Sequence, residues 1–156
     1  MSPNIKPTLQ ALLIADRIYT DKDTGKKIVA GIFHQLGFVS QEDMDAETQR
    51  TGTTPVFSCG NDAGSPFAYI SLTDVRGNQS FALRYVELNS ESVMFRCDFD
   101  INWDDPLMSV DLAIPLPRLP IGKTGVFALE LLWNDEPLGT FRVQVKQIKL
   151  PPAKET

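Results

Sequence analysis

Cysteine and histidine are scarce in this sequence, which limits the chemistry that it can carry. Its 156 residues include two cysteines, Cys59 and Cys97, and one histidine, His34. The cysteines lie far apart and lack the Cys-x-x-Cys spacing of zinc and redox sites, so no metal centre of that kind is expected. One disulfide is the expectation for an exported chain, whereas two reduced and largely buried thiols are the expectation for an internal one.

Long apolar runs and basic clusters are also missing. No apolar run approaches the ~18 residues needed to cross a bilayer. The opening MSPNIKPTLQALLIAD has a short apolar stretch that Gln10 interrupts and Asp16 ends, so it predicts a first strand rather than a signal peptide, and a cytoplasmic location. The net charge is −5, the pI is near 4.8 and the lysines are dispersed, which argues against a nucleic-acid partner. We therefore expect neither nucleic acid nor a membrane as the partner.

Motifs for enzymatic chemistry and for cofactors are absent from the sequence. It contains no Gly-x-Ser-x-Gly, no dinucleotide-binding Gly-x-Gly-x-x-Gly and no complete phosphate-binding loop, since PIGKTG lacks the first glycine. The alternative is a hydrolase with a thiol nucleophile, in which Cys59 in the segment SCG would use His34 as its base. A cysteine within the apolar rhythm of TPVFSCG is more often a small core residue. We predict a protein that is not an enzyme and needs no cofactor.

What the sequence does have is apolar and polar residues in alternation. The segment 93–101, VMFRCDFDI, places apolar side chains at every odd position, which is typical of a strand with one face on a core and one in water. Turn sequences such as DKDTGK, NSES and NDEPLG separate segments of this kind. The predicted strands are 9–19, 28–38, 67–73, 81–85, 93–101, 107–114, 127–133 and 141–145.

About eight short strands without helices between them predict an all-β fold. We expect an antiparallel β-sandwich of about 7–9 strands, immunoglobulin-like or C2-like, because parallel pairing would need crossover helices. Only 41–50, QEDMDAETQR, is a helix candidate, and with no apolar stripe it would be at most a short surface helix or a polar loop. The expected organisation is one domain over 9–149, with flexible tails at 1–8 and 150–156.

Two longer stretches resemble known families. ALLIADRIYTDKDTGKKIVAGIFHQL is similar to the opening of a family of uncharacterised bacterial β-sandwich proteins: an apolar strand ending in Asp, a turn with Gly-Lys, and an aliphatic-Gly-aliphatic-Phe strand. The matching residues are Asp16, Gly25, Lys26, Gly31, Ile32 and Phe33. The segment LPRLPIGKTGVFALELLWNDEPLGTFRVQV resembles the last hairpin of immunoglobulin-like domains, with its proline-bounded crossover. These motifs are structural, so the resemblance implies a fold and assigns no catalytic residue.

The stretch Thr20–Lys27, TDKDTGKK, raises the question of calcium. An EF-hand loop that starts at Asp21 needs an oxygen ligand at position 5, Gly at position 6 and Glu at position 12. The sequence has Gly25, Lys26 and Ile32 there, so we predict a hairpin turn with Gly25 in the left-handed conformation.

A C2-like calcium and lipid binder is a second hypothesis. It would require aspartates from separate loops to meet at one end of the sandwich, where a cation offsets their mutual repulsion. Alternation places several of them on the solvent face of a strand, where carboxylates need no metal. The aspartates concerned are Asp16, Asp21, Asp23, Asp98, Asp100, Asp104 and Asp105.

Two features suggest recognition. Pro117-Arg118-Leu-Pro120 has the Pro-x-x-Pro spacing of polyproline ligands, although prolines here also fit a crossing between sheets. Trp103 in a predicted loop is the best candidate for an exposed aromatic, within a set that includes Phe67, Tyr69 and Trp133. The leading prediction is a non-catalytic binding or scaffolding module whose partner is another protein or a second copy of itself, with these interaction candidates: Trp103, Pro117, Arg118 and Pro120.

Overall fold

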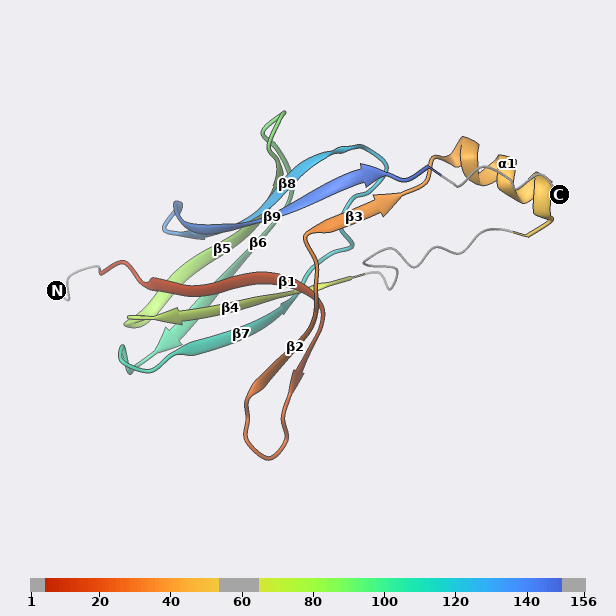
Figure 1. The fold of residues 1–156 in the computed structure, drawn as a ribbon. Coiled ribbons are helices and arrows are strands. Elements are labelled where there is room, and N and C mark those ends of the chain that lie inside the picture. Colours follow the sequence, from red (N-terminus) through yellow and green to blue (C-terminus); the bar gives the residue numbers. More distant parts are fainter. Residues whose placement is uncertain (1–4, 54–64, 150–156) are drawn as a thin grey trace.

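The computed structural model describes residues 5–53 and 65–149, which form nine strands and one helix (Figure 1). In chain order the elements are β1 (Thr8–Thr20), β2 (Lys27–Ile32), β3 (Gln35–Phe38), α1 (Gln41–Thr51), β4 (Phe67–Thr73), β5 (Gly77–Glu87), β6 (Ser92–Trp103), β7 (Val110–Pro115), β8 (Gly125–Trp133) and β9 (Glu136–Gln147).

The strands form two sheets that pack face to face as a β-sandwich, which confirms the predicted fold class (Figure 1). One sheet has the order β2-β1-β4-β7 and the other has the order β3-β9-β8-β5-β6. All neighbours are antiparallel except β3 and β9, which are parallel. Residues 116–124 cross from the first sheet to the second, as the proline-bounded segment predicted.

Alternation along the central strands builds the core. In β5, Phe81, Leu83 and Tyr85 point between the sheets and are buried, while Arg84 points outward. The same alternation in β8 buries Trp133, and its indole Nε1 donates a hydrogen bond to Gln79 Oε1 at 3.0 Å. Burial of these large side chains drives the two sheets together, because each contributes about 1.5–3 kcal/mol.

β6 shows the predicted alternation at weaker burial. Phe95, Cys97 and Phe99 face inward but remain half-buried, and Val93 is 51% exposed. The reason is position: in the described part of the chain β6 pairs only with β5 and is the last strand of its sheet. An edge strand lacks the second neighbour that would cover its side chains.

The predicted strand 28–38 is two strands in two sheets. β2 pairs with β1, β3 pairs with β9, and buried Phe33 lies at the bend between them. The helix prediction at 41–50 is confirmed: α1 is capped by Ser40, whose side chain accepts from the Asp43 amide, and none of its residues is buried. No helix among residues 5–53 and 65–149 is long and apolar enough to cross a membrane. The predicted N-terminal tail differs from the structure at its end, since Pro7 is buried and Thr8 begins β1.

Candidate functional site

The hairpin arm, which we define as residues 16–32, extends from one end of the sandwich (Figure 1). Its turn is the stretch TDKDTGKK. Asp21 Oδ1 accepts from the Asp23 amide at 2.8 Å and from the Thr24 amide at 3.3 Å, and the Gly25 amide donates to the Asp21 carbonyl. Gly25 has a φ of 72°, as predicted. These two backbone donors lower the pKa of Asp21, so its carboxylate serves the turn.

The base of the hairpin arm is a tight contact between its two strands. Gly31 has a φ of 77°, and a Cβ placed there would lie 2.6 Å from Asp16 Oδ2. Only glycine satisfies both requirements, the left-handed backbone and the missing side chain. Two residues of the proposed family motif, Asp16 and Gly31, therefore act together to set the start of the arm.

Apolar side chains lie exposed along one face of the hairpin arm. Tyr19 is 55% exposed, Ile28 is 50% exposed and Ile32 is 49% exposed. Tyr19 and Ile28 are directly opposite each other, and Ile32 is opposite Ala15 on the same face. In the described structure β2 pairs only with β1, so its outer edge is unpaired, and Ala15 on this face is fully buried whereas Tyr19, Ile28 and Ile32 are not. The pair Arg17–Ala30 lies between Ile32 and the Tyr19–Ile28 pair, so exposed Arg17 separates the apolar side chains. Exposed large apolar side chains grouped on one face make the arm a candidate interaction site.

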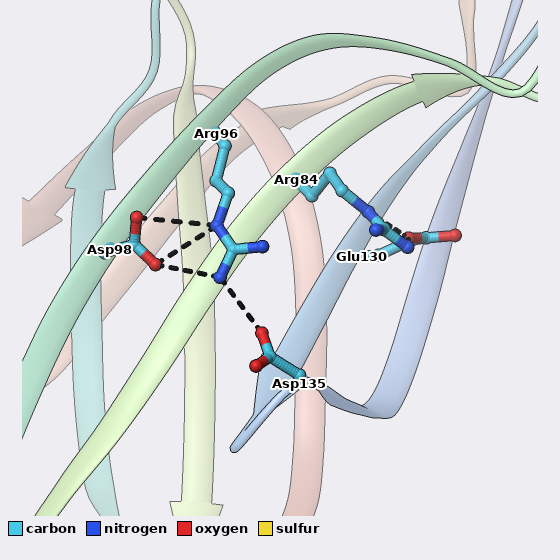
Figure 2. Close-up of polar contacts among 5 residues, drawn as sticks. All are labelled: Arg84, Arg96, Asp98, Glu130 and Asp135. Atoms are coloured by element: carbon cyan, nitrogen blue, oxygen red, sulfur yellow. Dashed lines mark hydrogen bonds and ion pairs between the residues drawn. The ribbon is translucent and has the colours of Figure 1, made fainter.

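The outer face of the five-stranded sheet carries paired charges (Figure 2). The Arg84 guanidinium donates from Nε and Nη2 to Glu130 Oε2, at 2.9 and 2.6 Å, across neighbouring strands β5 and β8. On β6, Arg96 pairs with Asp98 at 3.1 Å and with Asp135 at 3.2 Å. The hydrogen bonds that Arg96 donates to Asp98 and then to Asp135 raise the pKa of its guanidinium, which stays fully charged. The pairs of Arg96 are exposed and add little stability, whereas the Arg84–Glu130 pair is part-buried, with side chains 33% and 16% exposed.

One hollow lies on the outer face of the five-stranded sheet, and another lies beside the helix α1. One of about 340 Å³ is lined by Arg84, Glu130, Val86, Leu88, Glu91 and Val93, between the charged pair and the start of β6. The other, of about 570 Å³, separates α1 from the end of β9 and is lined largely by charged side chains of the helix. Neither has the enclosed apolar lining with a few convergent polar groups that small-molecule sites show.

The aspartates of the calcium hypothesis do not meet. Asp21 and Asp23 lie at the tip of the hairpin arm. Asp98 pairs with Arg96, Asp100 accepts from Ser80, and Asp105 accepts from the Leu107 amide within its own turn. Among residues 5–53 and 65–149 no three His, Cys, Asp or Glu side chains are grouped to hold a metal ion. The remaining two aspartates are Asp16, at the base of the arm, and Asp104, exposed after β6.

The predicted interaction residues fall on two separate parts of the fold. Trp103 is the last residue of β6, is half-buried against the core, and donates from Nε1 to the Met108 carbonyl at 3.3 Å. The expectation of an exposed loop tryptophan is therefore wrong, because β6 continues two residues further than predicted. Pro117 and Arg118 are exposed and Pro120 is partly exposed, at the opposite end of β7.

The Pro-x-x-Pro segment is fixed to the sandwich by its leucines. Leu116 and Leu119 are each only 3% exposed, and the Leu116 amide donates to the Pro66 carbonyl. A polyproline ligand must present its backbone freely to a groove. This segment instead holds the crossing between the sheets.

The hypothesis of a thiol nucleophile rests on Cys59, which lies outside the described residues. His34 is exposed beside β3, and its ring stacks on Phe141 with centroids 4.8 Å apart. Cys97 is a free thiol in β6, at the opposite edge of the same sheet. Four strand spacings of about 4.8 Å, or ~19 Å, separate the two edges, so His34 does not act on Cys97.

Comparisons with known proteins give no family. No family model matches the chain and no curated protein matches it, so membership of the bacterial β-sandwich family stays a prediction. One similar solved structure is a glycosyl hydrolase family 2 member from Bacteroides cellulosilyticus DSM 14838, at 15% identity and a TM-score of 0.34. The alignment covers 51% of this chain and 12% of that much longer one. A likeness at this level carries no argument about activity.

Proposed function

We propose that this protein is a non-catalytic protein-interaction module of immunoglobulin-like topology that docks its hairpin arm into an apolar groove of another protein. The observation that carries the proposal is the row of half-exposed apolar side chains, Tyr19, Ile28 and Ile32, on a hairpin that extends beyond the sandwich.

The strand order supports the immunoglobulin-like assignment. In immunoglobulin domains the sheets are A-B-E-D and G-F-C, with C′ added beside C in variable domains. If β1 is strand A, then β4, β5, β6, β7, β8 and β9 correspond in order to B, C, C′, E, F and G, and the observed pairings follow. Among the described strands D is missing, and the hairpin arm is the addition to this plan. Added hairpins and loops are where such scaffolds usually carry their binding function.

The chemistry of the arm describes its partner. The exposed halves of three large apolar side chains would contribute about 2–4 kcal/mol when covered. The exposed charges of the arm are Arg17, Lys22 and Lys26 against one exposed carboxylate, Asp23, whereas Asp21 is engaged in its own turn. A complementary groove would therefore be apolar along its floor and acidic at its rim, and binding would weaken as salt rises.

A photo-crosslinking experiment tests this function. Benzoylphenylalanine in place of Tyr19, in cells that make the protein naturally, is expected to yield a discrete protein adduct that Ile28→Lys abolishes. Since Ile28 is exposed, this second change should leave the free energy of unfolding within about 0.5 kcal/mol. The matched control places the same probe at exposed Arg142, on the outer face of β9, where no such adduct is expected. Adducts that persist in Ile28→Lys, or equal labelling from both positions, would refute the role of the arm.

A further inference from the structure

The exposed edge strand β6 has a self-complementary centre. Its residues Phe95-Arg96-Cys97-Asp98-Phe99 have an aromatic residue at each end, a cation and an anion inside these, and cysteine in the middle. The aromatics and Cys97 face inward, and the two charged side chains face outward. The order of charge reverses when the strand is read backward, which is how an antiparallel neighbour of identical sequence would meet it.

We propose that two copies of this chain pair through β6 in an antiparallel register centred on Cys97, joining the two five-stranded sheets into one. In this register Arg96 lies opposite Asp98 of the second copy, and Asp98 lies opposite Arg96 of the second copy. In the same way, Phe95 of each copy lies opposite Phe99 of the other copy. A two-fold contact requires such self-complementarity, since the same patch serves on both sides. Opposite charges and aromatic pairs directly across two strands are both favourable.

The neighbouring registers are less favourable. A register centred on Arg96 places Arg96 of one copy opposite Arg96 of the other. A register centred on Asp98 places the two copies of Asp98 opposite each other. Centring on Phe99 creates two contacts between Asp98 and Asp100. Only even shifts need comparison, because an odd shift would pair inward with outward side chains. The register centred on Cys97 is the one in this group that contains no like-charge pair.

The structure leaves β6 accessible for this contact. Arg96 and Asp98 side chains are 41% and 69% exposed, so both remain within reach of a second copy. The inward side chains Phe95 and Phe99 are only half-buried, and a further strand would cover them. β6 has a bulge at Met94, where Tyr85 pairs with Phe95 but Val86 pairs with Val93. This bulge limits the regular part of β6 to the residues that follow it, beginning with Phe95. Edge strands that are not paired or covered tend to add further strands. Charged side chains on an edge oppose such addition unless the added strand brings the opposite charges, as a second copy of β6 does here.

Charge reversal combined with sedimentation velocity tests the pairing. The wild-type chain is expected to sediment as a concentration-dependent dimer. Arg96→Asp alone sets aspartate against Asp98 of the second copy, and Asp98→Arg alone sets arginine against Arg96. Each single variant is expected to weaken dimerisation at least about tenfold, since each loses two attractive pairs and gains two repulsive ones.

Two combinations separate lost pairing from lost folding. The double variant Arg96→Asp/Asp98→Arg restores both cross-strand pairs and is expected to dimerise. An equimolar mixture of the two single variants is expected to form a heterodimer. Arg142→Asp, on the same sheet face but away from the edge, serves as the control and should leave the dimer unchanged. A wild-type chain that stays monomeric at millimolar concentration overturns the proposal, and so does a dimer that is indifferent to both single reversals.

Discussion

Replacement of Tyr85 by phenylalanine is expected to stabilise the protein. The side chain is fully buried between the sheets, and its ring stacks on Phe95 and Phe127 with centroids 5.2 and 5.4 Å away. Its hydroxyl has no hydrogen-bond partner among the residues that the structure describes. A buried polar group without a partner costs about 1–3 kcal/mol in lost hydration. Removing the oxygen leaves a void of about 10 Å³, which costs only about 0.2 kcal/mol.

The net expectation is a gain of about 1–2.5 kcal/mol in the free energy of unfolding. Urea denaturation measures it, with an unchanged m-value showing that the fold is retained. Tyr85→Leu is the matched comparison: it also removes the hydroxyl but loses both ring contacts, so it should be less stable than Tyr85→Phe by about 1–3 kcal/mol. A Tyr85→Phe variant less stable than the wild type would refute the reasoning, because the hydroxyl would then be well bonded.

The same substitution changes the response to alkali. Burial strongly raises the pKa of Tyr85, whereas an unfolded tyrosine loses its proton near its ordinary value of 10.0. Above that pH the unfolded chain binds fewer protons than the folded one, so stability falls as pH rises, by up to about 1.4 kcal/mol per pH unit from this group. Tyr85→Phe removes that contribution, and its stability should fall less steeply above pH 10. Denaturant titrations at a series of alkaline pH values measure both slopes.

Three further predictions concern the hairpin arm and the core. Gly31→Ala should lower the free energy of unfolding in urea by at least about 2 kcal/mol, because the alanine would adopt a left-handed backbone and clash with Asp16. Gly25→Ala, at a position with a similar φ and open space, should lower it by about 1 kcal/mol. Equal losses for the two variants would show that the Asp16 contact has no role. The low pKa of Asp21 means that the turn is fully bonded above its ordinary value of 3.8 and loosens as pH falls further, so the two amides that donate to its carboxylate should shift in NMR spectra over that acidic range and stay constant above it. Trp133→Phe should destabilise by about 1–3 kcal/mol through the lost indole hydrogen bond and lost packing, and an unchanged melting curve would contradict its place in the core.

The sandwich could be predicted because alternation is a local property. Whether Leu83 or Leu129 faces the core depends only on the two-residue repeat of its own strand, and both are fully buried as that repeat predicts. The turn at Asp21 was equally predictable, since its bonds are made within five residues. Local chemistry therefore determined these parts of the fold.

The candidate binding surfaces could not be predicted in the same way. The alternation around Phe95 is as regular as that around Leu129, yet only the strand order shows that β6 ends its sheet. The close approach of Gly31 to Asp16, near the end of β2 and before the chain continues into β3, joins residues far apart in sequence and is not marked by the hydrophobic pattern. A signal was nevertheless present: Ile28, Val29, Ile32 and Phe33 are apolar at both odd and even positions, which a single half-buried strand does not require.

The claim that this molecule acts through strands left uncovered by its own sheets is tested most directly by disulfide trapping at Cys97. In a Cys59→Ser background, mild oxidation with diamide, followed by mass spectrometry of the digested product, reports which thiols are adjacent between copies. The pairing centred on Cys97 predicts a Cys97–Cys97 cross-link between two chains, formed rapidly in the wild-type charge pattern and suppressed by Arg96→Asp. Cross-linking that is absent, or that proceeds equally in the charge-reversed variant, would contradict it.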